Sequence, residues 1–78
     1  MHYELWDTVS HNLLDDFASE AEAFAAVAAL VRLNGTAMAE SLTLLRLGGP
    51  AGDTVVARGA ELLGRARANG ARRGRQPA

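Results

Sequence analysis

Few residues of this chain could take part in acid–base, nucleophilic or metal chemistry. The 78 residues include two histidines, nine acidic residues and no cysteine, and all eight basic residues are arginine. Without cysteine there is no disulfide, no thiolate nucleophile and no iron–sulfur or cysteine-ligated zinc site. Without lysine there is no Schiff base and no phosphate-binding lysine of the P-loop kind. The composition therefore excludes redox chemistry and lysine-dependent catalysis.

His11, Asp15 and Asp16 are the densest group of side chains that could ligate a metal or exchange protons. Their spacing matches no established ligand pattern, and general acid–base catalysis needs such groups to converge in a pocket. We interpret them as solvated residues of a turn and of the strand that follows it. His2 follows Met1, where an incidental role is expected. The sequence thus predicts no catalytic residue, no metal or cofactor site and no small-molecule substrate.

The glycines between Gly48 and Gly52 could bind an anion through consecutive backbone amides. No lysine followed by Ser or Thr stands at the P-loop spacing, and a hairpin loop requires such residues by itself. We therefore assign this segment to a turn.

The first expected element is a β-hairpin. Residues 3–8 (YELWDT) place aromatic and apolar residues at near-alternating positions, which is the period of a half-buried strand. Turn-forming residues follow, and His11 or Asn12 can adopt the left-handed conformation that a tight turn requires. Residues 12–17 then form the return strand.

A helix is predicted to begin after Ser19. Ser19 and Glu22 match the capping box, in which the hydroxyl accepts a hydrogen bond from the backbone amide three residues later. Asn34 and Gly35 supply a C-terminal stop. The apolar residues between these signals repeat at helical spacing: Phe24, Val27, Ala28 and Val31.

The second half of the chain is expected to repeat the pattern of a hairpin and a helix. Residues 36–47 suit either a helix or a strand buried on both faces, and we expect a short helical turn followed by a strand. Residues 48–53 are rich in glycine and contain proline, and residues 54–57 (TVVA) are mostly β-branched, so a second hairpin accounts for both. Gly59 should end that strand, and residues 60–68 should form a short helix.

The expected order is therefore strand, strand, helix, strand, strand, helix (ββαββα). The simplest arrangement is a two-layer α+β fold, in which a four-stranded, mainly antiparallel sheet carries both helices on one face. Two hairpin-plus-helix units suggest a repeat, but the halves share no convincing residue identity. We expect one small domain at residues 1–68 and a disordered, arginine-rich tail at residues 69–78, which has nothing to bury.

Several strings of this chain resemble a group of short uncharacterised bacterial proteins. The resemblance covers about residues 3 to 66 and rests on Tyr3–Thr8, Asn12–Leu14, Ser19–Ala23, Asn34–Gly35 and Arg58–Ala60. It implies the same order of elements and a bacterial origin, and it brings no activity, cofactor or catalytic residue. In that group the first turn usually carries glycine where this chain has His11, and small residues stand where it has Asp15 and Asp16.

The expected strands carry apolar residues on both faces. Alternation puts Leu5 and Trp6 of the first strand on opposite faces, and it puts Leu13 and Phe17 of the second strand opposite Leu14. Either the helices are divided between the two faces, or the second face is buried against another chain. We favour self-association with Trp6 in the contact. The candidate interface residues are Trp6, Leu14, Leu45 and Leu47.

Charge is unevenly distributed along the chain. Residues 1–63 hold nine acids and three arginines, whereas residues 64–78 hold five arginines and no acid. The arginines could neutralise phosphates and give weak, salt-sensitive, sequence-independent binding of nucleic acid. The alternative of a solvated tail attracted to an acidic body is favoured, because no aromatic residue interleaves the arginines to stack on bases. The candidate nucleic-acid contacts are Arg65, Arg67, Arg72, Arg73 and Arg75.

The longest uncharged apolar run, residues 23–31, is far shorter than the roughly 20 residues of a membrane span. We therefore expect no membrane contact and a cytoplasmic location. The sequence favours a small non-enzymatic binding or regulatory protein that acts as a homo-oligomer, such as a dimer, or with a protein partner. The alternative is a nucleic-acid-associated accessory protein that uses the arginine segment.

Overall fold

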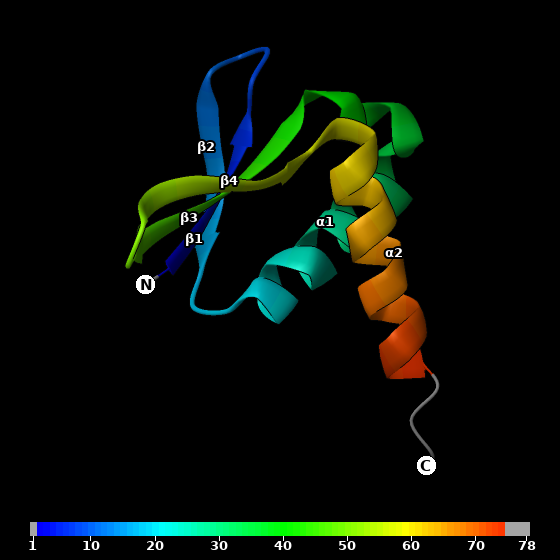
Figure 1. Ribbon diagram of the computed structural model, residues 1–78. Helices are drawn as coiled ribbons and strands as arrows, with labels where there is room; N and C mark the ends of the chain where they lie inside the picture. The colour runs from blue at the N-terminus through cyan, green and yellow to red at the C-terminus, as the bar shows by residue number, and fades with distance from the viewer. Residues whose placement is uncertain (1, 75–78) are drawn as a thin grey trace.

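The computed structural model describes the backbone of residues 2–74 and the side chains of residues 2–69. The chain forms two hairpins, each followed by a helix (Figure 1), as the sequence predicts. The elements are β1 (His2–Asp7), β2 (Asn12–Phe17), α1 (Glu20–Asn34), the 3₁₀ helix η1 (Thr36–Ser41), β3 (Leu42–Gly49), β4 (Gly52–Arg58) and α2 (Gly59–Gly74).

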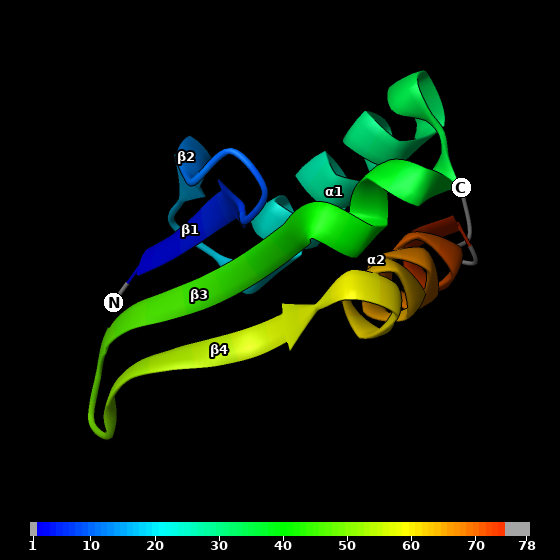
Figure 2. The ribbon, with the colours of Figure 1, turned by 90° about the horizontal axis from the view of Figure 1, so that it is seen from above.

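The four strands form one antiparallel sheet in the order β2-β1-β3-β4. Both helices lie on the same side of it: α1 packs on β1 and β2, α2 packs on β3 and β4, and the helices contact each other. Figure 2 shows β3 and β4 as a long hairpin whose turn projects beyond the helices. The predicted α+β architecture is confirmed. The core lies between sheet and helices and consists of Tyr3, Leu5, Ala23, Phe24, Val27, Val31, Ala39, Leu42, Leu44, Ala57, Leu62 and Ala66.

A β-bulge in the first hairpin changes which side chains share a face. Leu13 pairs with Trp6 and Phe17 pairs with Tyr3, and Leu14 is the extra residue between them. The extra residue interrupts the alternation of the strand. The expectation that Leu13 and Phe17 share a face is therefore wrong: Phe17 lies beside Tyr3 towards the helices, and Leu13 lies beside Trp6 on the opposite face.

The turn between β1 and β2 places a non-glycine residue in the left-handed region. His11 has a φ of 60°, a conformation that glycine adopts without the steric cost borne by other residues. The Asp7 carboxylate stabilises the turn by accepting hydrogen bonds from the backbone amides of Val9 at 3.0 Å and Ser10 at 3.4 Å. The prediction that His11 or Asn12 takes the left-handed position is confirmed.

Helix α1 begins and ends at the predicted signals. The Ser19 hydroxyl accepts a hydrogen bond from the Glu22 backbone amide at 3.2 Å. At the other end Gly35, with a φ of 94°, donates its amide to the Val31 carbonyl at 2.7 Å. The cap and the glycine stop satisfy backbone groups that the helix cannot pair internally.

Replacing Ser19 by alanine should lower the free energy of unfolding by about 1 kcal/mol, because it removes the acceptor for the Glu22 amide. Urea denaturation followed by circular dichroism measures this loss. Ser10→Ala is the matched control, since Ser10 lies exposed in the first turn and its hydroxyl caps no helix. Equal stability of the two variants would contradict the capping role.

The second half of the chain has the predicted elements, but its last helix is longer than the sequence predicts. The short helical turn and the strand expected at residues 36–47 are present as η1 and β3, but α2 continues to Gly74 instead of ending at Ala68. The predicted helix end at Ala68 is thus wrong, and residues 75–78 of the predicted tail lie outside the described part of the chain. Alanine and arginine are strong helix formers, and in this segment they outweigh the cost of its glycines.

The sheet order relates the two hairpin-plus-helix units by an approximate two-fold axis. β1 and β3 are the two central strands, and Leu5 pairs directly with Leu44 across them. Residues in equivalent core positions differ by 39 in number: Tyr3 and Leu42, Leu5 and Leu44, Ala23 and Leu62, Phe24 and Leu63, and Val27 and Ala66. The repeat that the sequence suggested is therefore present in space, although the paired residues share chemical class more than identity.

Candidate functional site

The sheet face turned away from the helices, called here the open sheet face, carries a mixture of apolar and polar side chains. Strand alternation and the registers assign to it His2, Glu4, Trp6, Leu13, Asp16, Thr43, Leu45, Leu47, Val55 and Arg58. The apolar members, called here the apolar stripe, are Leu13, Trp6, Leu45, Leu47 and Val55.

The apolar stripe crosses all four strands. Trp6 lies beside Leu13, Leu45 lies beside Val55, and the stripe steps from one row of the sheet to the next between β1 and β3. Leu13 is 47% exposed and Val55 is 50% exposed, while the three central members are partly buried by their neighbours. A contiguous apolar surface of this kind is typical of an interaction site.

Two polar contacts fix the aromatic ring of the stripe. The Trp6 indole nitrogen donates a hydrogen bond to Glu4 Oε1 at 3.1 Å, and Glu4 Oε2 lies 3.6 Å from His2 Nε2. The only polar atom of the indole is thereby satisfied within the chain, so the ring can be covered by an apolar surface without losing a hydrogen bond.

Three of the four residues predicted for the interface lie together in the apolar stripe, and Leu14 does not. Leu14 is the bulge residue of β2 and is 39% exposed. Sequence reasoning missed two members of the stripe. Alternation along β4 is the signal that could have found Val55, whereas the bulge conceals Leu13.

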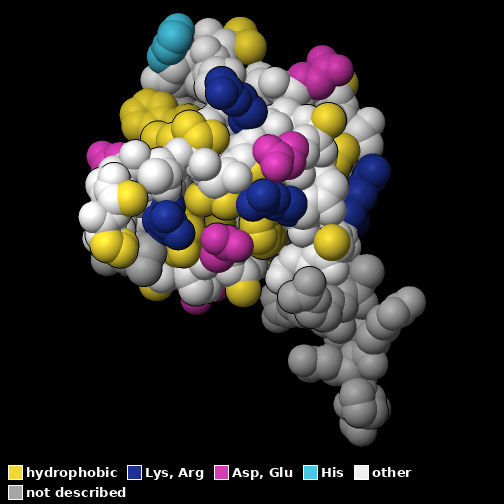
Figure 3. Space-filling model, in the orientation of Figure 1, with side chains coloured by type: hydrophobic (Ala, Val, Ile, Leu, Met, Phe, Trp, Pro, Cys, Tyr) yellow, Lys and Arg dark blue, Asp and Glu magenta, His cyan; other side chains and the backbone are white. Residues whose placement is uncertain are grey.

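The candidate nucleic-acid residues are only partly described. Arg65 and Arg67 are exposed on α2, Arg72 and Arg73 lie in its last turns with side chains outside the described range, and Arg75 lies beyond it. Arg65 Nη2 donates to Glu61 Oε2 at 3.3 Å, an exposed i,i+4 pair worth a few tenths of a kcal/mol, or about 0.3. Acidic and basic side chains are interspersed on the face seen in Figure 3. Nucleic-acid binding stays a prediction.

The candidate metal or acid–base group is spread over two faces of the sheet edge. His11 lies in the turn, Asp16 pairs with Glu4 on the open sheet face, and Asp15 pairs with Leu5 on the opposite face. Asp15 Oδ1 accepts a hydrogen bond from the Asp16 amide at 2.8 Å. Within residues 2–69 no three His, Asp or Glu side chains come together as metal ligands.

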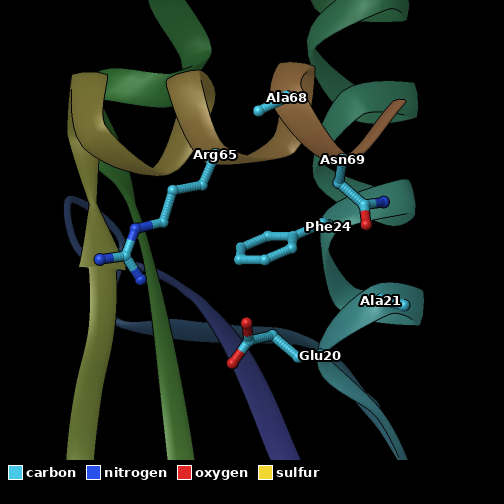
Figure 4. A pocket seen from close by; sticks show the side chains of 6 residues that line it. All are labelled: Glu20, Ala21, Phe24, Arg65, Ala68 and Asn69. Atoms are coloured by element: carbon cyan, nitrogen blue, oxygen red, sulfur yellow. The ribbon is translucent and has the colours of Figure 1, made fainter. Parts of the chain in front are cut away.

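The helix layer has a hollow of about 290 Å³ between α1 and α2. Figure 4 shows Glu20 of α1 and Arg65 of α2 on either side of the Phe24 ring, with alanine and asparagine completing the wall. A second hollow of about 320 Å³ lies between η1 and α2 and includes Thr36, Glu40 and Leu63. Neither places a nucleophile beside a base, so neither has the arrangement that covalent catalysis requires.

Neither α1 nor the described length of α2 is long and apolar enough to cross a membrane. Among residues 2–69, the arrangement that remains is a sheet face with a fixed aromatic ring and without converging catalytic groups. No protein-family model, curated protein or solved structure matches this chain.

Proposed function

We propose that this chain is a small non-enzymatic binding or regulatory protein whose working surface is the open sheet face. The observation that carries the proposal is the apolar stripe on a sheet face that no helix covers. Among the described residues the helices and the core occupy only the other face. The side chains of the stripe are therefore accessible to another protein.

Covering the stripe is energetically favourable. Removing apolar surface from water is worth about 25 cal/mol per Å². The area available for burial comes from the exposed halves of Leu13 and Val55 and from the partly exposed residues at the centre of the stripe. The Trp6 nitrogen keeps its bond to Glu4 when the ring is covered. A large aromatic ring with a satisfied polar atom is the kind of residue that dominates the binding energy of interfaces.

A non-catalytic role is supported by the composition and by the hollows. The chain has no cysteine or lysine, and its two histidines lie at the edge of the open sheet face and in a turn. Glu20 and Arg65, which flank the hollow in Figure 4, are charged groups beside an apolar ring. That combination supplies neither a nucleophile nor a general base with a partner to orient it.

A photoreactive amino acid at Leu47 should form discrete covalent adducts with a protein in cells that express this chain. Leu47 belongs to the stripe and is central in the sheet, so a docked partner would lie directly over it. Denaturing electrophoresis and mass spectrometry measure the mass and identity of each adduct.

The matched control carries the photoreactive amino acid at Leu33, which is 80% exposed on α1 in the helix layer. A second control adds Trp6→Arg to the Leu47 variant and should remove the adducts, because a charge interrupts the stripe. No adduct at Leu47, or the same adducts from both positions, would overturn the proposal.

A further inference from the structure

The polar residues of the open sheet face are separated by the apolar stripe into two groups of different charge. One row across the sheet reads Leu13, Trp6, Thr43 and Arg58, and the next reads Asp16, Glu4, Leu45 and Val55. The stripe takes the first half of one row and the second half of the other, and Leu47 extends it into a third row, beside His2. It therefore leaves Asp16 and Glu4 on one side, and Thr43 and Arg58 on the other.

The outermost charges of these groups are available to a partner. Asp16 and Arg58 are both exposed, and neither forms an ion pair with another side chain within residues 2–69. The two residues lie on opposite edge strands, β2 and β4. The open sheet face is thus apolar along a diagonal, acidic at one flank and basic at the other.

We propose that the open sheet face docks onto the same face of a second copy of this chain, around a two-fold axis that lies along the apolar stripe. Such an axis turns the stripe onto itself and exchanges its two flanks. Apolar residues then meet apolar residues, with Trp6 and Leu45 close to their own counterparts. At the same time the acidic flank of each copy faces the flank with Thr43 and Arg58 of the other, with Glu4 nearest to Thr43 and with Asp16 and Arg58 offset along the axis.

Charge complementarity selects a second copy over other occupants. A surface with one acidic and one basic flank complements itself after a two-fold rotation, whereas a partner of uniform charge would be repelled by one flank. Edge-to-edge pairing of sheets is less suitable, because the β2 edge carries Asp15 and Asp16 and both edge strands are bulged.

The size of the surface sets the strength of the contact. Four strands spaced about 4.8 Å apart, each six residues long with a rise of about 3.4 Å per residue, give a sheet face of about 19 Å by 20 Å. The flat area of this face is about 400 Å² per copy, without the contribution of side-chain shape. The total of about 800 Å² is below the roughly 1,000 Å² that a stable specific interface buries, so the contact belongs to the weak, transient class. The dimer is therefore reversible and forms at high protein concentration.

Reversing the charges of the flanks tests the inference, which rests on the proposed function. The experiment uses the purified chain alone, so it separates a second copy from any other partner. Sedimentation equilibrium of the full chain between about 1 and 500 µM should give a concentration-dependent mass. Arg58→Glu should weaken association about tenfold, because it makes both flanks acidic, and Asp16→Arg should weaken it less, because Glu4 keeps a negative charge on the first flank. The double variant should recover part of the association that Arg58→Glu loses, because the outermost residues of the two flanks again carry opposite charges.

A cysteine cross-link tests the position of the axis independently of the charges. The chain has no cysteine of its own, so Leu45→Cys creates a single thiol close to the axis and should give a disulfide-linked dimer on mild oxidation. Leu33→Cys, equally single but in the helix layer, should remain monomeric. Circular dichroism of every variant confirms that it is folded.

Two outcomes would overturn the inference. One is a monomer at all concentrations together with equal, slow oxidation of the two cysteine variants. The other is a double variant that is folded but associates no better than Arg58→Glu. If purified protein is monomeric while adducts with a different protein form at Leu47 in cells, the second copy is excluded and the proposed binding function survives.

Discussion

Replacing Leu44 by alanine should lower the free energy of unfolding by about 3 kcal/mol. Leu44 is 0% exposed on a central strand and pairs with Leu5, which is also fully buried, and with Ala57 on β4. Removing three carbon atoms there leaves a cavity between the sheet and the helices that rigid neighbours cannot fill. Small single domains have about 3–5 kcal/mol of stability in total, so the variant should be largely unfolded at 37 °C.

Urea denaturation at 10 °C, followed by far-UV circular dichroism, measures the effect in a range where both proteins unfold cooperatively. Leu33→Ala is the control, since it removes the same atoms from a side chain that is 80% exposed, and its midpoint should match the wild type. A Leu44→Ala midpoint that also matches would contradict the central place of this residue in the core.

The elements that could be predicted from sequence are those with local signals. Ser19 and Gly35 delimit α1 because capping and the glycine stop act within a few residues. The strand at Leu42–Leu47 and the left-handed His11 were also predictable, since each depends on immediate neighbours. The assignment of Trp6 to the face opposite Leu5 followed from alternation alone.

The errors arose where longer-range structure overrides a local rule. Alternation fails at Leu14, because pairing with β1 inserts a bulge that no pattern within β2 announces. The predicted end of α2 at Ala68 is too early, because residues 69–74 continue the helix although their sequence offers little apolar surface to bury. The registers that bring Trp6 beside Leu13 and Leu45 beside Val55 depend on four strands at once, so the course of the apolar stripe required the structure.

The approximate two-fold axis within the chain explains why so short a sequence makes a two-layer core. Each half supplies one central strand, one edge strand and one helix, and the Leu5–Leu44 pair lies where the halves meet. The same symmetry leaves the opposite face uncovered on both hairpins, because each half has only one helix. The open sheet face is therefore a consequence of the repeat itself.

Replacing Val27 by aspartate should have the larger effect of the two core substitutions, exceeding about 4 kcal/mol. Val27 is 0% exposed, and no polar or charged side chain is buried among the described residues. An aspartate there would have no hydrogen-bond or ion-pair partner in the core, and burying an unpaired charge costs more than losing apolar contacts. The whole stability of the domain would be lost, and the far-UV circular dichroism spectrum should be that of an unfolded chain.

Ala25→Asp separates this effect from helix propensity. Ala25 is exposed on the same helix, two residues away, so it receives the same side chain in the same secondary structure with full access to water. This control should stay folded and lose less than about 1 kcal/mol. If Val27→Asp and Ala25→Asp unfold at similar urea concentrations, α1 does not pack on the sheet through the face that carries Val27. The two halves would then be held together by the β1–β3 ladder without the helix layer.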